Sequence, residues 1–584
     1  MENLLIVLPL FFAPLLIKLE QKVRDVLSIV FILILSSLSV VHFFSFTHSL
    51  DIDISDVFHS IFTFLDIVLL FYFLMQGYLF KHKFVLLLSS LQILLYRYIL
   101  TLDFSIASSD IIVDSLSTLF YLIINIVGGV IILFALKYIE SEEFTRVKKN
   151  SFIAILFFFL AVMNFIVSTN SIETFFMLFE LTTLSSYVLI GYRADEVSKQ
   201  NALRALWVNQ IGGVAILLAL VLSIKEYDTI YFDILIANIE NSYLLPIAFL
   251  VLAGFVKGAS IPFEKWLLGA MVAPTPVSAI LHSATMVKIA PFLMLKLAPA
   301  MDSFLSLTIT LFGTFVFVTA SFLALSKDYF KEILGLSTIA LLALMMALAS
   351  IGTEEATLAC LILITFHAIS KALLFLQAGI LEKNFHLKYV QDIDGLINHS
   401  PLVVFFILIG FASLTLPPFG AFIAKMMALE SLTALIKLNP LYAIALVFIA
   451  LGSVFLTLLY FKIVTKLFAK DSDAEVEKRD ISLFYKVPSY LLVMMLFIGI
   501  YVSFQNNFLT NFEIFISTAL LLLIPIFLEF FLFKKADRVK EYCCGEKDEL
   551  EVSMYYFDLS DGLKRWIRVL SYIFIATLFI GVLL

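Results

Sequence analysis

Long apolar runs follow one another along the whole chain and are separated by short polar segments. A helix that crosses the hydrocarbon core of a bilayer needs about 20 apolar residues at a rise of 1.5 Å per residue. On that scale the pattern predicts an all-α polytopic membrane protein with about 18 transmembrane helices. The expected spans are 3–19, 26–47, 60–80, 84–101, 115–137, 151–168, 172–191, 202–224, 244–270, 277–298, 304–325, 333–351, 356–380, 400–434, 441–467, 484–504, 512–533 and 567–584.

Two of these apolar runs contain residues that interrupt a helix. Residues 257–262 combine glycine and proline, and residues 417–420 read Pro-Pro-Phe-Gly. Because proline removes a backbone donor and clashes with the preceding turn, we expect one broken helix at each place. The two breaks lie five spans apart and are expected to open from opposite sides, a pattern typical of inverted repeats with ion sites near the midplane. The alternative is that glycine and proline are simply more frequent in membrane helices.

Composition narrows the class of protein further. Hydrophobic residues make up 62% of the chain and charged residues 15%, against about 45–50% and about 25% in soluble domains. A soluble enzyme, a disordered scaffold and a secreted module are therefore excluded. The net charge of −7 and the absence of a basic block with interleaved aromatics give no indication of nucleic-acid binding. Cys360, Cys543 and Cys544 have no CxxC spacing, so no metal site, disulfide framework or iron–sulfur cluster is expected on this chain.

The charges of the short loops predict the orientation in the membrane, since Lys and Arg in short loops stay on the cytoplasmic side. One set of loops carries most of the cations, and a cytoplasmic loop is expected over 534–566. The other set is acidic at Asp51, Asp53, Asp56, Asp110, Glu226, Asp228, Glu354 and Glu355. This asymmetry predicts a multi-pass protein of the inner (cytoplasmic) membrane with both termini outside.

Several charged residues fall inside the predicted spans. They are Asp66, Glu180, Arg204, Lys257, Lys288, Lys371 and Lys425, with His282 and His367 nearby. Each would cost about 3 kcal/mol if it faced lipid, and together they would cost about 20 kcal/mol, more than a typical folding stability. They must therefore face one another or water inside the bundle. Ion pairs that fasten helices together would explain a matched pair, but not so many lysines with so few acids.

Lysine and histidine have the chemistry that proton transfer needs. Burial and like charge favour the neutral form of a lysine, so a buried lysine can bind and release a proton, whereas arginine holds a fixed charge. Neutral histidine has one donor and one acceptor nitrogen and can relay protons between lysines. His367 and Lys371 are four residues apart and share a helix face. His282 and Lys288 are six apart, which predicts opposing faces of a continuous helix.

Three segments carry a family resemblance. Phe175-Phe-Met-Leu-Phe-Glu180, Ala273-Pro-Thr-Pro-Val-Ser-Ala-Ile-Leu-His282 and His367-Ala-Ile-Ser-Lys371 resemble the proton-pumping antiporter-like membrane subunits. This superfamily includes the large membrane subunits of respiratory complex I (NADH-quinone oxidoreductase), Mrp-type sodium/proton antiporters and energy-converting membrane-bound hydrogenases. The resemblance extends from about Asp114 to Lys425. It implies two inverted five-helix repeats, each with one broken helix.

The resemblance also implies roles for individual residues. Glu180 and Lys257 would pair and form the first half-channel, His282 would pass protons to a central line, and Lys425 would lead to the exit. The implied proton-translocation residues are Glu180, Lys257, His282, Lys288, His367, Lys371 and Lys425, with Arg204 as a fixed charge where the family commonly has lysine. Met426 follows Lys425 where the complex I versions frequently carry an acid.

The resemblance divides the chain into four parts. It implies N-terminal helices over 1–114, a first antiporter-like half over 115–298, a second half over 299–467, and C-terminal helices with the 534–566 loop over 468–584. The two helices near 60–101 have no counterpart in the complex I pattern. Tyr542-Cys-Cys-Gly545 followed by Met554-Tyr-Tyr-Phe557 looks like the C-terminal region of hydrogenase-4 and formate-hydrogenlyase type subunits.

The leading hypothesis is therefore an ion-translocating subunit, with the proton favoured as the ion, of a group 4 [NiFe] hydrogenase or formate-hydrogenlyase-like complex. This chain would carry no redox or hydrolytic site and no cofactor; nickel–iron and iron–sulfur centres are expected in partner subunits of a peripheral redox arm. The alternatives are a membrane anchor that moves nothing, a complex I subunit, an Mrp-type or free-standing Na⁺/H⁺ antiporter subunit, and a transporter for inorganic-carbon uptake.

Overall fold

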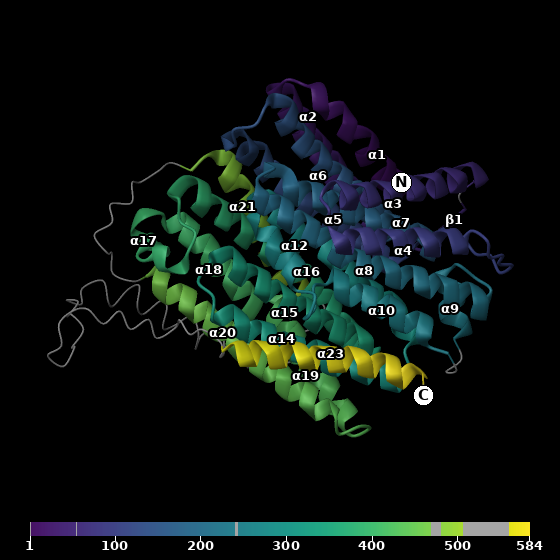
Figure 1. Ribbon diagram of the computed structural model, residues 1–584. Helices are drawn as coiled ribbons and strands as arrows, with labels where there is room; N and C mark the ends of the chain where they lie inside the picture. Colours follow the sequence, from purple (N-terminus) through teal and green to yellow (C-terminus); the bar gives the residue numbers. More distant parts are fainter. Residues whose placement is uncertain (1, 54, 240–242, 469–480, 506–559, 584) are drawn as a thin grey trace.

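The protein is a long bundle of roughly parallel helices (Figure 1). The computed structural model describes residues 2–53, 55–239, 243–468, 481–505 and 560–583. The predicted span 512–533, most of the loop 534–566, Cys543 and Cys544 lie outside the described residues. So do the two short segments that look like hydrogenase-4.

The described helices follow one another with short connections, and two three-residue strands pair antiparallel. The first group is α1 (Glu2–Leu15), α2 (Gln21–Ser45), β1 (Leu50–Ile52), α3 (Asp56–Leu79), α4 (Lys83–Ile99), β2 (Ile111–Val113), α5 (Ser115–Tyr138), α6 (Arg146–Ile166), α7 (Ile172–Ile190), α8 (Glu196–Tyr227), α9 (Phe232–Asn238), α10 (Leu245–Lys257) and α11 (Lys265–Gly269). The second group is α12 (Thr275–Ser283), α13 (Ile289–Leu297), α14 (Ser303–Leu325), α15 (Phe330–Ile351), α16 (Glu354–Ile380), α17 (Leu396–His399), α18 (Pro401–Thr415), α19 (Gly420–Ile436), α20 (Tyr442–Leu467), α21 (Leu483–Gln505) and α23 (Asp561–Leu583).

Fourteen helical segments of the described chain are long and apolar enough to cross a membrane. Their burial separates the interior of the bundle from its edges. The apolar window of α15 is entirely enclosed by other helices, whereas only 22% of the window in α3 and 17% of that in α23 is buried. Because the exposed parts of α3 and α23 are apolar, they are suited to lipid. The chain is thus an α-helical membrane protein.

Both predicted breaks interrupt a helix in the structure. The first separates α10, which ends at Lys257, from α11. The second separates α18, which ends at Thr415, from α19, which begins at Gly420. Prolines 417 and 418 lack the backbone N–H groups that would continue the hydrogen-bond ladder of α18. The inverted relation of the two halves and their boundaries stay predictions.

A third interruption lies between α12 and α13, where a continuous span over 277–298 is expected. Residues 286–288 form a 3₁₀ turn, and Thr285 has the non-helical backbone angles φ −123° and ψ −114°. The Thr285 hydroxyl donates a 2.7 Å hydrogen bond to the carbonyl of Ile280. A threonine that binds the backbone in this way offers it an alternative to the helical ladder.

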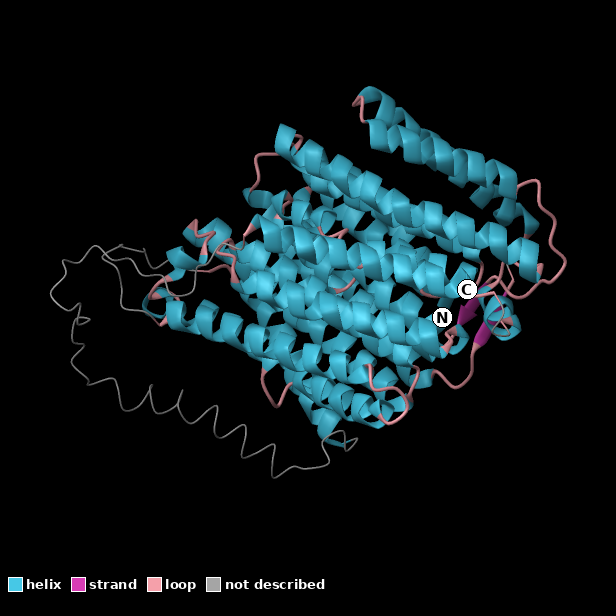
Figure 2. Cartoon of the chain, turned by 60° about the horizontal axis from the view of Figure 1, so that its bottom comes forward, coloured by secondary structure: helices cyan, strands magenta, loops and turns pink. Residues whose placement is uncertain are grey.

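The two ends of the bundle differ in character. The strand end, which we define by the pair β1–β2, also holds both ends of the described chain (Figures 1 and 2). The opposite end carries ion pairs, such as Arg24 with Glu140 at 2.9 Å and Lys383 with Glu142 at 2.8 Å. Burial would raise the pKa of Glu142, but Lys383 and Arg193 hold that pKa below its usual value. Which end faces the outside of the membrane stays a prediction.

Candidate functional site

The first broken helix places Lys257 fully inside the protein. Its ammonium donates hydrogen bonds to the carbonyl oxygen of Phe179 at 3.1 Å and to the Thr183 hydroxyl at 3.0 Å. It also lies 3.7 Å from the centre of the Phe179 ring, a cation–π distance. All these partners belong to α7, so Lys257 links the break directly to the helix that carries Glu180.

Glu180 is equally buried but lies beside Lys257 rather than in contact with it. Its Oε1 accepts a 2.7 Å hydrogen bond from the Gln92 side chain of α4, and its Oε2 has no hydrogen-bond partner within the described residues. In the part of the chain that the structure describes, no cation lies within ion-pair distance, 4.0 Å, of Glu180. The implied direct pair is therefore open in this conformation, with Thr183 next to both groups.

A glycine gives Glu180 and Gln92 their place against α8. A methyl group on Gly213 would overlap both Oε1 of Glu180 and the Gln92 amide nitrogen. Only a residue without a Cβ atom therefore allows the two side chains to meet at the surface of α8.

The central group lies on α16 and on the interrupted helix opposite it. Lys288 is buried, and its ammonium lies 2.8 Å from Nδ1 of His367 and 3.7 Å from the sulfur of Met345. Nε2 of His367 has no partner within the described residues. Because a lysine ammonium can only donate, Nδ1 of His367 must accept when Lys288 is charged.

Lys371 and His282 complete this central group. The ammonium of Lys371 donates to the carbonyl of Leu334 at 3.1 Å and to the Ser337 hydroxyl at 2.5 Å, both on α15. The His282 ring packs 4.9 Å from the ring of Phe375 on α16, and neither of its nitrogens has a partner within the described residues.

The prediction that His282 and Lys288 lie on opposing faces is wrong. Both approach α16, and both are near enough to His367 to interact with it electrostatically. The prediction assumed a continuous helix, whereas the interruption at residues 284–288 resets the angular relation between the two residues.

The second broken helix carries Lys425, which is 4% exposed. Its ammonium reaches back across the break and donates a 3.0 Å hydrogen bond to the carbonyl of Leu414. Leu414 lies in the last turn of α18, where carbonyls lack a helical partner. The lysine thus satisfies a backbone group that the break leaves free.

Arg204 does not belong to this buried set. It lies two turns into α8, is partly exposed, and donates a 3.0 Å hydrogen bond to Asn201 on the same helix. Its charge is therefore close to an end of the bundle.

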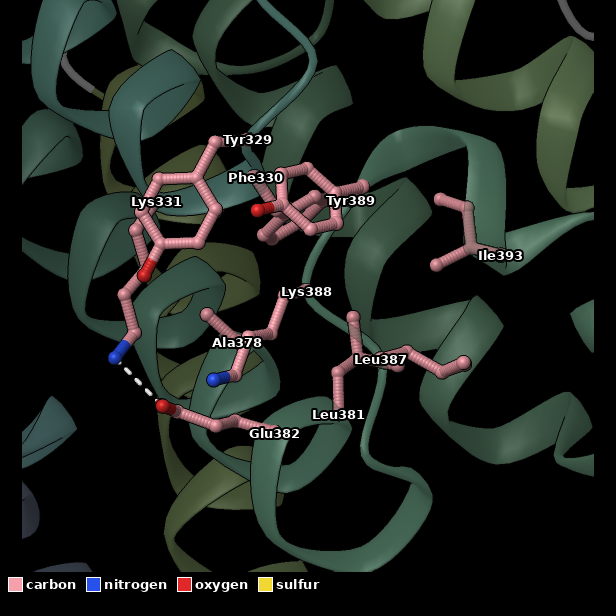
Figure 3. A pocket seen from close by; sticks show the side chains of 10 residues that line it. All are labelled: Tyr329, Phe330, Lys331, Ala378, Leu381, Glu382, Leu387, Lys388, Tyr389 and Ile393. Carbon is pink, nitrogen blue, oxygen red and sulfur yellow. Dashed lines mark hydrogen bonds and ion pairs between the residues drawn. The ribbon is translucent and has the colours of Figure 1, made fainter.

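The structure adds residues that the sequence reasoning missed. At the end opposite the strands, Lys331 and Glu382 form a 2.6 Å ion pair beside a cavity of about 10 Å³ (Figure 3). Such a volume holds about one water molecule. Glu382 lies three turns beyond Lys371 on the same helical segment and also accepts from Thr275. A charged pair therefore lies between the central group and this end of the bundle.

The arrangement is suited to binding and releasing protons inside a membrane. Its lysines, histidines and Glu180 are enclosed, and the hydrogen-bond partners of the lysines are neutral groups. In the described residues no three His, Cys, Asp or Glu side chains converge as a metal site would require. The fold and these groups define a polytopic membrane protein with a buried row of titratable residues.

Comparison with known proteins gives the family. Residues 169–457 match the family described as NADH:quinone oxidoreductase/Mrp antiporter, membrane part. A Na⁺/H⁺ antiporter subunit of Alkalihalophilus pseudofirmus is 32% identical over 352 residues, 56% of this chain and 43% of that protein. Another Na⁺/H⁺ antiporter subunit, from Staphylococcus haemolyticus, is 30% identical over the same shares. The chain belongs to the superfamily of antiporter-like membrane subunits and spans about half the length of the curated relatives that it matches.

A solved structure supports the fold over a larger part of the chain. A chain of the membrane-bound sulfane sulfur reductase, an archaeal respiratory membrane complex, superposes with a TM-score of 0.69. The match covers 87% of this chain and 96% of that one at 19% sequence identity. At this identity the likeness establishes a common fold.

Proposed function

We propose that this protein is the proton-translocating subunit of a multi-subunit membrane complex. The observation that carries the proposal is the set of four enclosed lysines, Lys257, Lys288, Lys371 and Lys425, none of which has a carboxylate within 4.0 Å in the described structure. A charged lysine in such a place is expensive, and the neutral form is correspondingly accessible. Lysines that alternate between these forms carry protons.

Lysine chemistry favours the proton over sodium as the ion. An ammonium has three donors and no acceptor, so it cannot coordinate a metal cation. The direct contact between Lys288 and His367 gives one step of transfer without any intervening group. Between Lys257 and the central group, and between that group and Lys425, water has to complete the path.

Opening and closing of the ion pair between Glu180 and Lys257 would control the proton affinity of the enclosed lysines. An adjacent carboxylate stabilises a charged lysine, and its withdrawal favours release of the proton. Thr183, which accepts from Lys257 and lies next to Glu180, is placed to hold the open arrangement. Movement of Glu180 or Lys257 past Thr183 would close the pair.

We further propose that the complex is an oxidoreductase of the group 4 [NiFe] hydrogenase or formate-hydrogenlyase type. The C-terminal segment around Cys543 and Cys544 supports this assignment by its order of residues, and the fold shared with a chain of an archaeal respiratory complex is compatible with it. Electrons would then move in partner subunits that hold the nickel–iron and iron–sulfur centres.

A second candidate is a component of an Mrp-type Na⁺/H⁺ antiporter. The observation that favours it is the 30–32% identity to two proteins named as Na⁺/H⁺ antiporter subunits. In that case an ion gradient instead of electron transfer would drive the same row of lysines.

Affinity purification of the chain from its native membranes separates these candidates. Nickel, iron and large soluble subunits that co-purify in constant ratio support the oxidoreductase. A set of only small membrane subunits supports the antiporter. Proton uptake by proteoliposomes of the purified complex tests translocation itself, and the loss of uptake in an assembled Lys257→Met complex is the expected result.

A further inference from the structure

The helices α3 and α4, for which the sequence gives no role, contribute side chains directly to the buried site. They lie beside α7 and α8 (Figure 1). Gln92 of α4 donates to Glu180, and Tyr96, one turn farther along α4, contacts two more acids. These acids are Asp66 of α3 and Glu173 of α7. We call Asp66, Tyr96 and Glu173 the entrance cluster.

One phenol oxygen joins the two carboxyl groups of this cluster. The Tyr96 hydroxyl lies 3.2 Å from Oδ2 of Asp66 and 2.9 Å from Oε1 of Glu173. A tyrosine hydroxyl has a single proton and can donate to only one of these oxygens. The second contact is a hydrogen bond only if the other carboxyl group carries a proton and donates to the phenol oxygen.

The surroundings of Asp66 also favour one bound proton. Asp66 is 2% exposed, and its Oδ1 has no hydrogen-bond partner within the described residues. Its electrostatic neighbours are the acids Glu173 and Glu180, and Thr63 lies next to the Tyr96 hydroxyl. Among the described residues no cation lies within 4.0 Å of Asp66 or Glu173. Two neighbouring carboxyl groups, Asp66 buried and Glu173 partly buried, cannot both be ionised at low cost without a cation beside them.

The cluster connects the strand end with Glu180. Glu173 lies in the first turn of α7, and its electrostatic neighbours toward the strand end are His59 and Asp110, which are 3.1 Å apart. Glu180 lies two turns deeper on α7. Asp66 interacts electrostatically with both glutamates. A series of acids therefore leads from the partly exposed His59 at the strand end to the buried Glu180.

We propose that the entrance cluster is a proton-binding site through which protons reach or leave Glu180 from the strand end. One proton is shared by Asp66 and Glu173. When the acid donates its proton to the Tyr96 oxygen and the phenol gives its own to the other carboxylate, the acid form moves across and the tyrosine keeps one proton. Transfer to Glu180 continues beside Gln92. This proposal rests on the proposed function, since the entrance cluster would supply protons to Glu180 and the enclosed lysines.

Infrared spectroscopy of the purified complex tests the bound proton without any measurement of transport. The wild type should show the C=O stretch of a protonated carboxyl group that shifts in D₂O. Asp66→Asn should remove this band, and Tyr96→Phe, which removes only the hydroxyl, should shift it. The control Asp103→Asn alters an exposed acid between α4 and β2 and should leave the band unchanged.

Proton uptake by proteoliposomes tests the route. Asp66→Asn and Tyr96→Phe should each lower the initial rate by about tenfold, and Asp103→Asn should not change it. Should Asp66→Asn fail to assemble, Tyr96→Phe decides, because its ring fills the same volume. Wild-type uptake and an unchanged carboxyl band in Tyr96→Phe would overturn the proposal.

Two further outcomes separate this proposal from the function it rests on. If Lys257→Met abolishes uptake while Asp66→Asn transports normally, the entrance cluster is refuted and the translocation row stands. If Lys257→Met transports normally, the translocation row itself is refuted. A carboxyl band that appears in the wild type only after sodium is removed would assign the cluster to sodium and overturn the proton assignment.

Discussion

Each broken helix carries a buried lysine at or near its break, Lys257 at the end of α10 and Lys425 in the second turn of α19, but the two lysines have different surroundings. At the first break the backbone is already satisfied: the carbonyl of Val256 accepts from Trp266, and those of Gly254 and Phe255 accept from residues within the break. Lys257 is therefore free to point at α7 and the neighbourhood of Glu180. At the second break Lys425 itself caps the end of α18 through the carbonyl of Leu414.

On the proposed function, Lys257 would serve transfer alone, whereas Lys425 would also stabilise the fold through the Leu414 carbonyl. Glu180 is an electrostatic neighbour of Lys257, whereas no charged neighbour of Lys425 is found among the described residues. The lysine at the first break thus interacts with an acid, whereas the lysine at the second break binds a carbonyl at the end of a helix. Substitutions at the two lysines should have different balances of lost transport and lost stability.

The largest expected effect belongs to Lys257→Met. This variant removes the titratable group and keeps most of the volume, and the Phe179 carbonyl that it leaves still accepts from Thr183. We expect proton uptake to fall by about 100-fold, with normal assembly. Lys437→Met, at an exposed position after α19, is the matched control. Loss of assembly in Lys257→Met would instead indicate a role in fastening helices.

Lys371→Arg should be almost as damaging as Lys371→Ala. Arginine keeps the charge and approximate length but does not release its proton, so the central group would hold a fixed charge. Initial rates of proton uptake measure this directly. Lys327→Arg is the control, because this partly exposed lysine forms an ion pair with Glu332 away from the central group. Arg204→Lys should also be tolerated, and normal uptake in Lys371→Arg would require another carrier.

Lys425→Met should show a smaller loss of transport together with a loss of stability. The Leu414 carbonyl would lose its donor, which costs about 1–3 kcal/mol for a buried polar group. A lower melting temperature of the detergent-solubilised complex, absent from Lys257→Met, is the expected signature. Equal melting temperatures in the two variants would remove the distinction between the breaks.

The smallest effect is expected for Gly213→Ala. The added methyl group displaces Glu180 and Gln92 from α8 without removing any titratable group. We expect proton uptake to decrease by several-fold and assembly to be retained. Gly191→Ala is the control, since its methyl group would meet only the Cβ of Ala202 at an ordinary distance. Identical rates in the two variants would show that the position of Glu180 against α8 has no importance.

The features that follow from local chemistry could be predicted from the sequence. Proline and glycine identified both predicted breaks, and the charge within apolar runs identified Lys257, Lys288, Lys371 and Lys425 as enclosed. The break at residues 284–288 has no such signal, because it depends on a threonine that binds its own backbone. The central pair of Lys288 and His367 was consequently missed.

Contacts between distant helices could not be predicted in the same way. Gln92 and Tyr96 lie in an apolar run that resembles nothing specific, and only the packing of α4 along α8 brings them to Glu180 and Glu173. The implied pair of Glu180 and Lys257 was right in its neighbourhood and too simple in its geometry. A single sequence does not determine whether two such side chains touch or are separated by a threonine.

Proton uptake into sodium-free proteoliposomes of the purified complex tests the central claim most directly. The complex is energised by its electron donor, or by an imposed membrane potential if only membrane subunits co-purify, and an internal dye reports pH. In the sodium-free arm we predict uptake that a protonophore abolishes and that an assembled Lys257→Met complex lacks. Cation movement that requires sodium and survives the protonophore, or normal uptake in Lys257→Met, would contradict the account.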